Sequence, residues 1–91
     1  MNLTHKEITI SGIVQGVGFR YSCLRIARSM GIRGFVKNSD NGDVYIEAEG
    51  EEYQLQLFLK WCWEGSSHAR ITNVSHQNGK PKHYKVFEIK H

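Results

Sequence analysis

The stretch from residue 6 to residue 30, KEITISGIVQGVGFRYSCLRIARSM, changes its hydrophobic period once, at two closely spaced glycines. Before the glycines the apolar residues alternate with polar ones, which predicts a strand over residues 6–14. From about Arg20 the apolar residues recur at the three- and four-residue spacing of one helix face, and we expect this helix to end before Gly31. Its core stripe is predicted to be Cys23, Ile26, Ala27 and Met30.

The remaining residues repeat this alternation of strands and helices. The expected elements are strands at 33–38 and 44–49 joined by an Asn41-Gly42 turn, a helix from Glu51 and Glu52 to Gly65, a weaker strand at 70–76, a polar loop at 78–82 and a final strand at 84–90. The order is β-α-β-β-α-β with one more short β segment. It predicts an α+β protein with a ferredoxin-like sandwich, in which two helices lie on one face of an antiparallel sheet of four to five strands.

Length and composition restrict the class of protein further. Residues 1–91 suffice for one domain, and a net charge of +3 is too small for the dense basic surface of a nucleic-acid-binding protein. The N-terminus does not resemble a signal peptide, and no apolar run approaches the ~20 residues that a membrane span needs. We therefore expect a cytoplasmic location, with no nucleic-acid or membrane partner. We also expect a monomer.

The cysteines and histidines do not suggest a metal site. Cys23 and Cys62 form no CxxC pair and fall on the expected core stripes of the two helices, so we interpret them as buried free thiols. A bond between them, or a reactive Cys23 near the start of its helix, is the alternative. The histidines are scattered along the chain, at His5, His68, His76, His83 and His91. We therefore predict neither a bound metal nor a cofactor.

The glycine turn is the best candidate for a binding site. Gly16 and Gly18 allow positive φ and a close approach to a ligand, and successive amides just before a helix form a concave anion site. Arg20 adds a planar, two-pronged donor that matches phosphate oxygens. Neither GxGxxG nor the P-loop pattern fits this turn. The alternative is that the glycines only form a tight turn and that Arg20 is a solvated charge.

Two segments carry a resemblance to a known family. Gly12-x-Val14-Gln15-Gly16-Val17-x-Phe19-Arg20 resembles the first signature of the acylphosphatase family, and Gly34-Phe35-Val36-Lys37-Asn38-x-x-x-Gly42-x-Val44-x5-Gly50 resembles the second. The match covers most of residues 12–50 and weakens after Gly50. The family's fold is the one expected above.

The resemblance implies metal-independent hydrolysis of acyl phosphates to carboxylate and inorganic phosphate. It implies that Arg20 binds the phosphoryl group and that Asn38 orients the attacking water. The site would be completed by backbone amides, and we call it the phosphoryl cradle. These amides would be those of Gln15, Gly16, Val17, Gly18 and Phe19. We expect the side chains of Gln15 and Phe19 to support the turn and the core.

Three alternatives stay open. Asn38 lies near a turn, where asparagine often only caps the backbone. The segment RGFV at 33–36 shares part of an RNA-recognition signature. It lacks the G/A-F step that precedes the valine in that signature, and it lies on the second strand and not on the third. The main alternative function is a non-catalytic phosphate- or anion-binding regulatory domain of the same fold.

Overall fold

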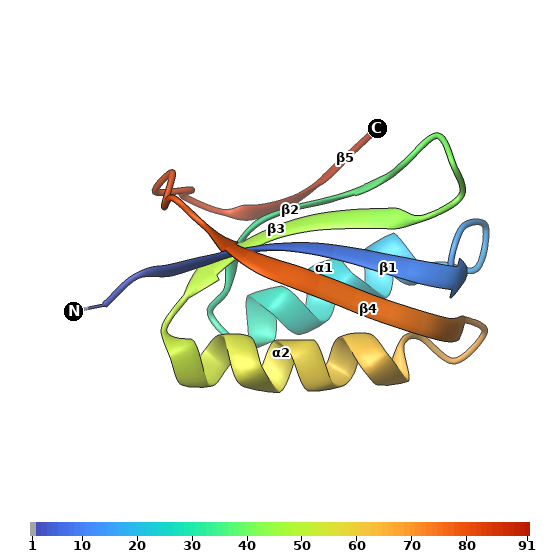
Figure 1. Cartoon of the computed structure of the whole chain (residues 1–91), viewed down its shortest axis with the longest axis horizontal. Helices are drawn as coiled ribbons and strands as arrows, with labels where there is room; N and C mark the ends of the chain where they lie inside the picture. Colours follow the sequence, from blue (N-terminus) through green and yellow to red (C-terminus); the bar gives the residue numbers. More distant parts are fainter. Residues whose placement is uncertain (1) are drawn as a thin grey trace.

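The computed structural model describes residues 2–91 and has two layers, a five-stranded sheet and two helices that cover one of its faces (Figure 1). The elements are β1 (Thr4–Ile13), α1 (Phe19–Ser29), β2 (Arg33–Asn38), β3 (Val44–Gly50), α2 (Glu52–Glu64), β4 (Arg70–Gly79) and β5 (Phe87–Lys90). The predicted α+β class and ferredoxin-like arrangement are confirmed.

The sheet is mixed, which corrects the expectation of a purely antiparallel sheet. Its strand order is β4-β1-β3-β2-β5, and the first three neighbouring pairs are antiparallel, whereas β5 runs parallel to β2. The reason lies in residues 80–86, which cross from β4 to the opposite edge at one end of the sheet (Figure 1). Because β5 starts at the end where β2 starts, it must run in the same direction.

Hydrogen bonds fix the end of α1 and the start of α2. At the end of α1 the amide of Ile32 donates to the carbonyl of Ala27, and the helix stops before Gly31. Glu51 is the N-cap of α2 and not its first helical residue, and it forms a capping box with Gln54. Gln54 Nε2 also donates to the carbonyl of Met30, so the same side chain ties the start of α2 to the end of α1.

The core lies between the helices and one face of the sheet. On α2 the buried stripe consists of Leu55, Phe58, Leu59 and Cys62. On α1, Cys23 and Ala27 are buried, while Ile26 and Met30 pack against the core at its edge. The strands contribute alternate residues, as their patterns predict: Ile8, Ile10, Val36, Val44, Ile46, Ala48, Val74 and Phe87. Neither helix in residues 2–91 has the length and apolar character to cross a membrane.

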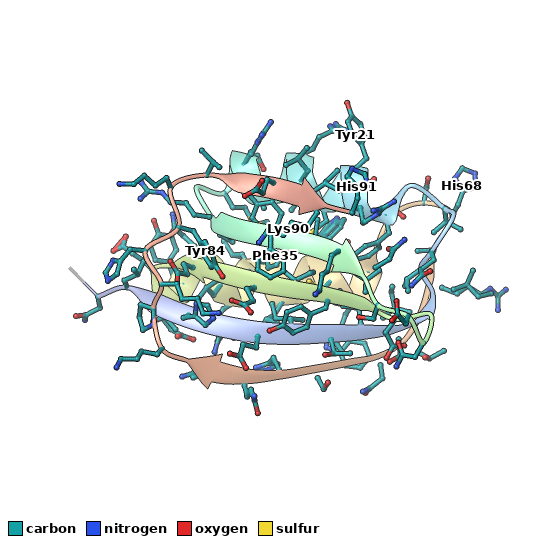
Figure 2. All side chains as sticks on the ribbon, turned by 90° about the horizontal axis from the view of Figure 1, so that it is seen from above. Tyr21, Phe35, His68, Tyr84, Lys90 and His91 are labelled. Atoms are coloured by element: carbon teal, nitrogen blue, oxygen red, sulfur yellow. The ribbon has the colours of Figure 1, made fainter. Side chains whose placement is uncertain are left out.

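The other face of the sheet is partly covered by aromatic side chains and by the crossing segment. Figure 2 shows Phe35, Tyr84 and Lys90 over this face, with the helices behind the sheet. Lys90 Nζ lies 4.2 Å from the centroid of the Phe35 ring, and Tyr84 meets the same ring edge-on at 5.9 Å. We call this side the open face, since no helix covers it.

Candidate active site

The turn between β1 and α1 contains two glycines in the left-handed conformation. Gly16 has φ 75° and Gly18 has φ 76°, values that cost an ordinary L-residue about 1–2 kcal/mol. A Cβ at either position would meet no protein atom within 4 Å. The glycines are therefore required by the backbone conformation and leave open space beside the amides of the turn.

The first turn of α1 presents free amides to the same space. Gly18 is the N-cap of the helix, and it has no side chain that could cap the first amides. No acidic residue lies in this turn. The positive end of the helix is thus available to an anion from outside the protein.

Gln15 braces the turn against the β2–β3 hairpin. Its Nε2 donates to the carbonyl oxygens of Ser39 and Asp43, at 2.8 Å each. This side chain therefore positions the glycine turn relative to Asn38, the last residue of β2. The supporting role expected for Gln15 fits this geometry, and so does that of Phe19, which is 1% exposed and packs on Trp61.

Asn38 has a buried side-chain oxygen without a partner. Among residues 2–91, nothing donates a hydrogen bond to its Oδ1. The hairpin next to it is held by other groups: the amide of Ser39 donates to the carbonyl of Asp43, and Asn41 Oδ1 accepts from the amide of Asp43. Asn38 Oδ1 therefore does not cap the turn, and Asn41 performs that role.

Arg20, the second residue of α1, points toward the end of β5. Its Nη1 donates to the carbonyl of Lys90 at 3.4 Å and lies 3.3 Å from His91 Nδ1. Both contacts use one of the two terminal nitrogens, so most of the five N–H donors of the guanidinium remain available. Both contacts are exposed, and they link the guanidinium to the C-terminal strand.

These groups line one cleft of about 190 Å³. It brings together Gly16, Gly18, Phe19, Arg20 and Asn38, whereas the side chains of Gln15 and Val17 do not line it. Val14, which belongs to the first signature, also lines the cleft. The remaining lining residues follow no motif and were not predicted: Tyr21, Ile89 and His91. Figure 2 shows Tyr21 and His91 close to each other at this end of the sheet.

The cleft is suited to an anion and poorly suited to a divalent cation. None of the lining residues is acidic or a cysteine, and His91 is the only one with a side chain that commonly binds metals. A group of potential metal ligands that includes His5 lies at the opposite end of β1. His5 is therefore not isolated, contrary to what the scattered histidines suggested.

The two cysteines are free and buried. Burial raises the pKa of both thiols, and Cys62 adds to the effect at Cys23. They are therefore protonated at neutral pH, and the alternatives of a disulfide or a reactive Cys23 find no support.

A known protein family matches most of the chain. The sequence profile of the Acylphosphatase family matches residues 6–89. The chain belongs to the acylphosphatase family.

Individual acylphosphatases are similar over nearly their whole length. The acylphosphatase of Thermotoga petrophila is 47% identical over 85 residues, which cover 93% of this chain and 94% of that protein. The crystal structure of the acylphosphatase from Bacillus subtilis superimposes with a TM-score of 0.94 at 36% identity, over 99% of this chain and all of the other. A structure of full-length HypF in a phosphate- and nucleotide-bound form has a TM-score of 0.88 at 34% identity, but this chain covers only 12% of it.

The comparisons support acylphosphatase activity (EC 3.6.1.7) for this chain, with an acyl phosphate as substrate and phosphate as product. They cover the final strands as well as the two signatures, so the chain after Gly50 is no exception to the family fold.

Proposed function

We propose that the cleft binds the phosphoryl group of an acyl phosphate and hydrolyses it by in-line attack of a water molecule held by Asn38. One observation carries this proposal: the left-handed glycine turn, Arg20 and the unpartnered Oδ1 of Asn38 line the same cleft. Asn38 is separated from the turn by 20 residues of sequence, and the Gln15 side chain joins the two segments directly.

The phosphoryl group would be bound by Arg20 and by the amides of residues 15–19. The two left-handed glycines expose successive N–H groups, and the uncapped start of α1 adds its positive end. Arg20 would contact two phosphoryl oxygens with its planar fork. The absence of carboxylates among the lining residues leaves this positive field uncompensated.

Asn38 would hold the attacking water. A buried amide oxygen without a partner can accept a hydrogen bond from the water, and its NH₂ group can donate one. Such a contact orients the water's lone pair toward phosphorus. Phosphoryl transfer through a loose transition state needs little more than this positioning and charge stabilisation.

The leaving group makes a general acid unnecessary. The bond between phosphorus and the bridging oxygen breaks, and the electron pair leaves with a carboxylate whose conjugate acid has a pKa near ~4. The attacking water loses its protons to solvent and phosphate, so inorganic phosphate is the second product. The cleft requires no titratable acid, and none of its lining residues is aspartate or glutamate.

Hydrolysis of acetyl phosphate by the purified protein, with and without excess chelator, tests the proposal. We expect turnover that inorganic phosphate inhibits competitively and that chelator leaves unchanged. Binding of phosphate without turnover would instead favour the alternative, a regulatory anion-binding domain.

We also propose that residues 1–91 act as one domain and as a monomer in the cytoplasm. The first and last strands belong to one sheet, which supports a single folding unit. Two buried free thiols suit a reducing compartment. Sedimentation equilibrium at micromolar concentration would detect a dimer and so contradict the monomer.

A further inference from the structure

A second group of polar side chains lies on the open face, at the end of β1 opposite to the cleft. His5 and Glu7 lie on β1, and their antiparallel partners on β3 are Glu49 and Glu47. Alternate residues of a strand point to the same side, so these four side chains converge. Neither the proposed hydrolysis nor the family signatures involve any of them.

His5 is buried, and its two ring nitrogens differ. The residue is 1% exposed, and Nδ1 lies 2.7 Å from Glu49 Oε2. Nε2 has no hydrogen-bond partner in residues 2–91. It is directed at two carboxylates, with Glu47 Oε1 at 3.4 Å and Glu7 Oε2 at 3.9 Å. A ring that donates Nδ1–H to a carboxylate keeps the lone pair of Nε2 free for a metal ion.

The distances fit a small tetrahedral ion. Ligands at ~2.0–2.1 Å from Zn²⁺ lie about 3.3–3.4 Å from each other. The separation of His5 Nε2 and Glu47 Oε1 already has this value, and all three ligand atoms lie within 4.8 Å of one another. Glu7 Oε2 lies 3.9 Å from Nε2, so this carboxylate would have to move closer to bind the ion. Its side chain is 29% exposed, which leaves it free to move.

The charges also favour a cation. Three carboxylates, those of Glu7, Glu47 and Glu49, face a single ammonium, since Lys82 is the only lysine or arginine of the described chain that forms an ion pair with them. The three carboxylates and this one ammonium carry a net charge of −2, which one divalent cation would balance.

The carboxylate of Glu47 is held in place by three hydrogen bonds. Burial alone would raise its pKa, but hydrogen bonds from Tyr84, Tyr45 and Lys82 outweigh burial and lower the pKa to about 2. The pKa of Glu49 is lowered as well, because hydrogen bonds from the backbone of Lys82, from His5 and from the backbone of Tyr84 outweigh burial. The donors from Tyr45, Tyr84 and Lys82 fix the position of the Glu47 carboxylate beside His5.

The neighbouring strand leaves room for the cluster. Gly79 of β4 lies opposite His5, and a Cβ there would meet His5 Cδ2 at 2.7 Å and Glu7 Oε2 at 2.8 Å. A side chain at Gly79 would push the two ligands away from each other.

We propose that His5, Glu7 and Glu47 bind one divalent transition-metal ion of the Zn²⁺ type, with Glu49 positioning the imidazole. One nitrogen and two oxygens form the donor set that Zn²⁺ accepts and that Mg²⁺ does not prefer. Bound there, the ion joins β1 to β3 and, through the hydrogen bonds of Glu47 and Glu49, to residues 82–84. Its role is to stabilise the fold, because the cleft lies at the other end of β1.

Calorimetric titration of the full chain with Zn²⁺ tests this proposal. We expect one ion per chain, and a melting temperature higher by roughly 10–20 °C when free Zn²⁺ exceeds Kd a hundredfold. Glu7→Gln should weaken the affinity at least about tenfold while the protein stays folded. His5→Gln should abolish binding of Zn²⁺. Because His5 is buried, the His5→Gln variant could fail to fold, and Glu7→Gln is then the decisive variant.

Two further variants separate a metal site from a purely structural network. Lys82 Nζ lies 3.0 Å from the Glu47 oxygen that would bind the ion, and its side chain is 54% exposed. Lys82→Met should therefore tighten Zn²⁺ binding, whereas loss of an ion pair in a metal-free network only destabilises the fold. Glu88→Gln and His76→Asn remove exposed groups outside the cluster and should leave the affinity unchanged.

Three results would overturn the proposal. The first is the absence of stoichiometric Zn²⁺ binding. The second is an adventitious ion only, recognised by an affinity that Glu7→Gln leaves unchanged or that His76→Asn removes. The third is a nitrogen NMR spectrum in which both ring nitrogens of His5 stay protonated in excess Zn²⁺, since an imidazolium has no lone pair for a metal.

Discussion

Replacing Asn38 by alanine is expected to affect catalysis and stability very differently. Its Oδ1 is buried without a partner, so the substitution removes no internal hydrogen bond at this atom. The buried, unsatisfied acceptor itself costs about 1–3 kcal/mol, part of which alanine would recover. We therefore expect the free energy of unfolding to change by less than about 1 kcal/mol.

The effect on turnover should be much larger. Loss of one group that contacts the reacting atoms typically lowers kcat by about 10²–10³, or ~2.7–4 kcal/mol. Because Asn38 would contact the water and not the phosphoryl group, the inhibition constant of inorganic phosphate should change less than about threefold. Steady-state hydrolysis of acetyl phosphate, competition by phosphate and unfolding in urea measure the three quantities.

Asn41→Ala in the same hairpin is the matched control. The Asn41 side chain accepts from the amide of Asp43 at 3.0 Å and donates to its carboxylate at 3.2 Å. Its loss should cost about 0.5–1.5 kcal/mol of stability and leave kcat unchanged. Asn38 does not hold the attacking water if Asn38→Ala retains wild-type kcat, or if this variant loses phosphate affinity while turnover persists.

The other predictions concern the phosphoryl cradle and the buried carboxylates. Arg20→Ala should weaken phosphate inhibition and lower kcat/KM by a factor equivalent to at least ~2–4 kcal/mol. Arg20→Lys should recover only part of this loss, because an ammonium cannot form the two-pronged contact. Full activity of the lysine variant would show that only charge matters. Gly18→Val should destabilise the fold by about 1–2 kcal/mol, because valine would have to adopt a positive φ. The same variant should weaken inhibition by phosphate at least about tenfold. Wild-type inhibition would show that the turn does not bind the phosphoryl group. The pKa of Glu47 lies near 2 in the folded protein, where hydrogen bonds outweigh burial, against an ordinary value of 4.5. Its contribution to stability is therefore complete above about pH 4.5 and is lost as the pH falls toward 2. Glu47→Gln should lower the stability measured in urea at about pH 7 and should make stability fall less steeply with acid. An equally steep fall in the variant would contradict the low pKa of Glu47.

The crossing segment shows where hydrophobic patterns fail. Residues 84–90 alternate like a strand, but β5 begins only at Phe87. The amides of Lys82 and Tyr84 donate to the carboxylate of Glu49 and do not pair with a strand. In the opposite direction, β4 extends beyond the predicted residue 76 to Gly79, because β1 continues to pair with it as far as His5. Strand ends depend on partners that lie far away in the sequence, and a local pattern does not contain them.

The sequence by itself determined the features that depend on neighbouring residues. The change of period in residues 6–30, the Asn41-Gly42 turn and the core stripe of α2 all follow from local conformation and from the burial of one face. The two signatures also indicated the family and pointed to Arg20 and Asn38 as site residues. The structure brings these two residues to one cleft.

Only the tertiary structure decided the features that require distant segments to meet. The parallel pairing of β5 follows from the place where residues 80–86 cross the sheet, and this crossing also brings His91 to Arg20. The convergence of His5 with Glu7 and Glu47 follows from the register of β1 and β3, which pairs residues about 40 positions apart. The spacing of these residues in the sequence carries no sign of the cluster, since the register of two strands depends on the packing of the whole sheet against its helices.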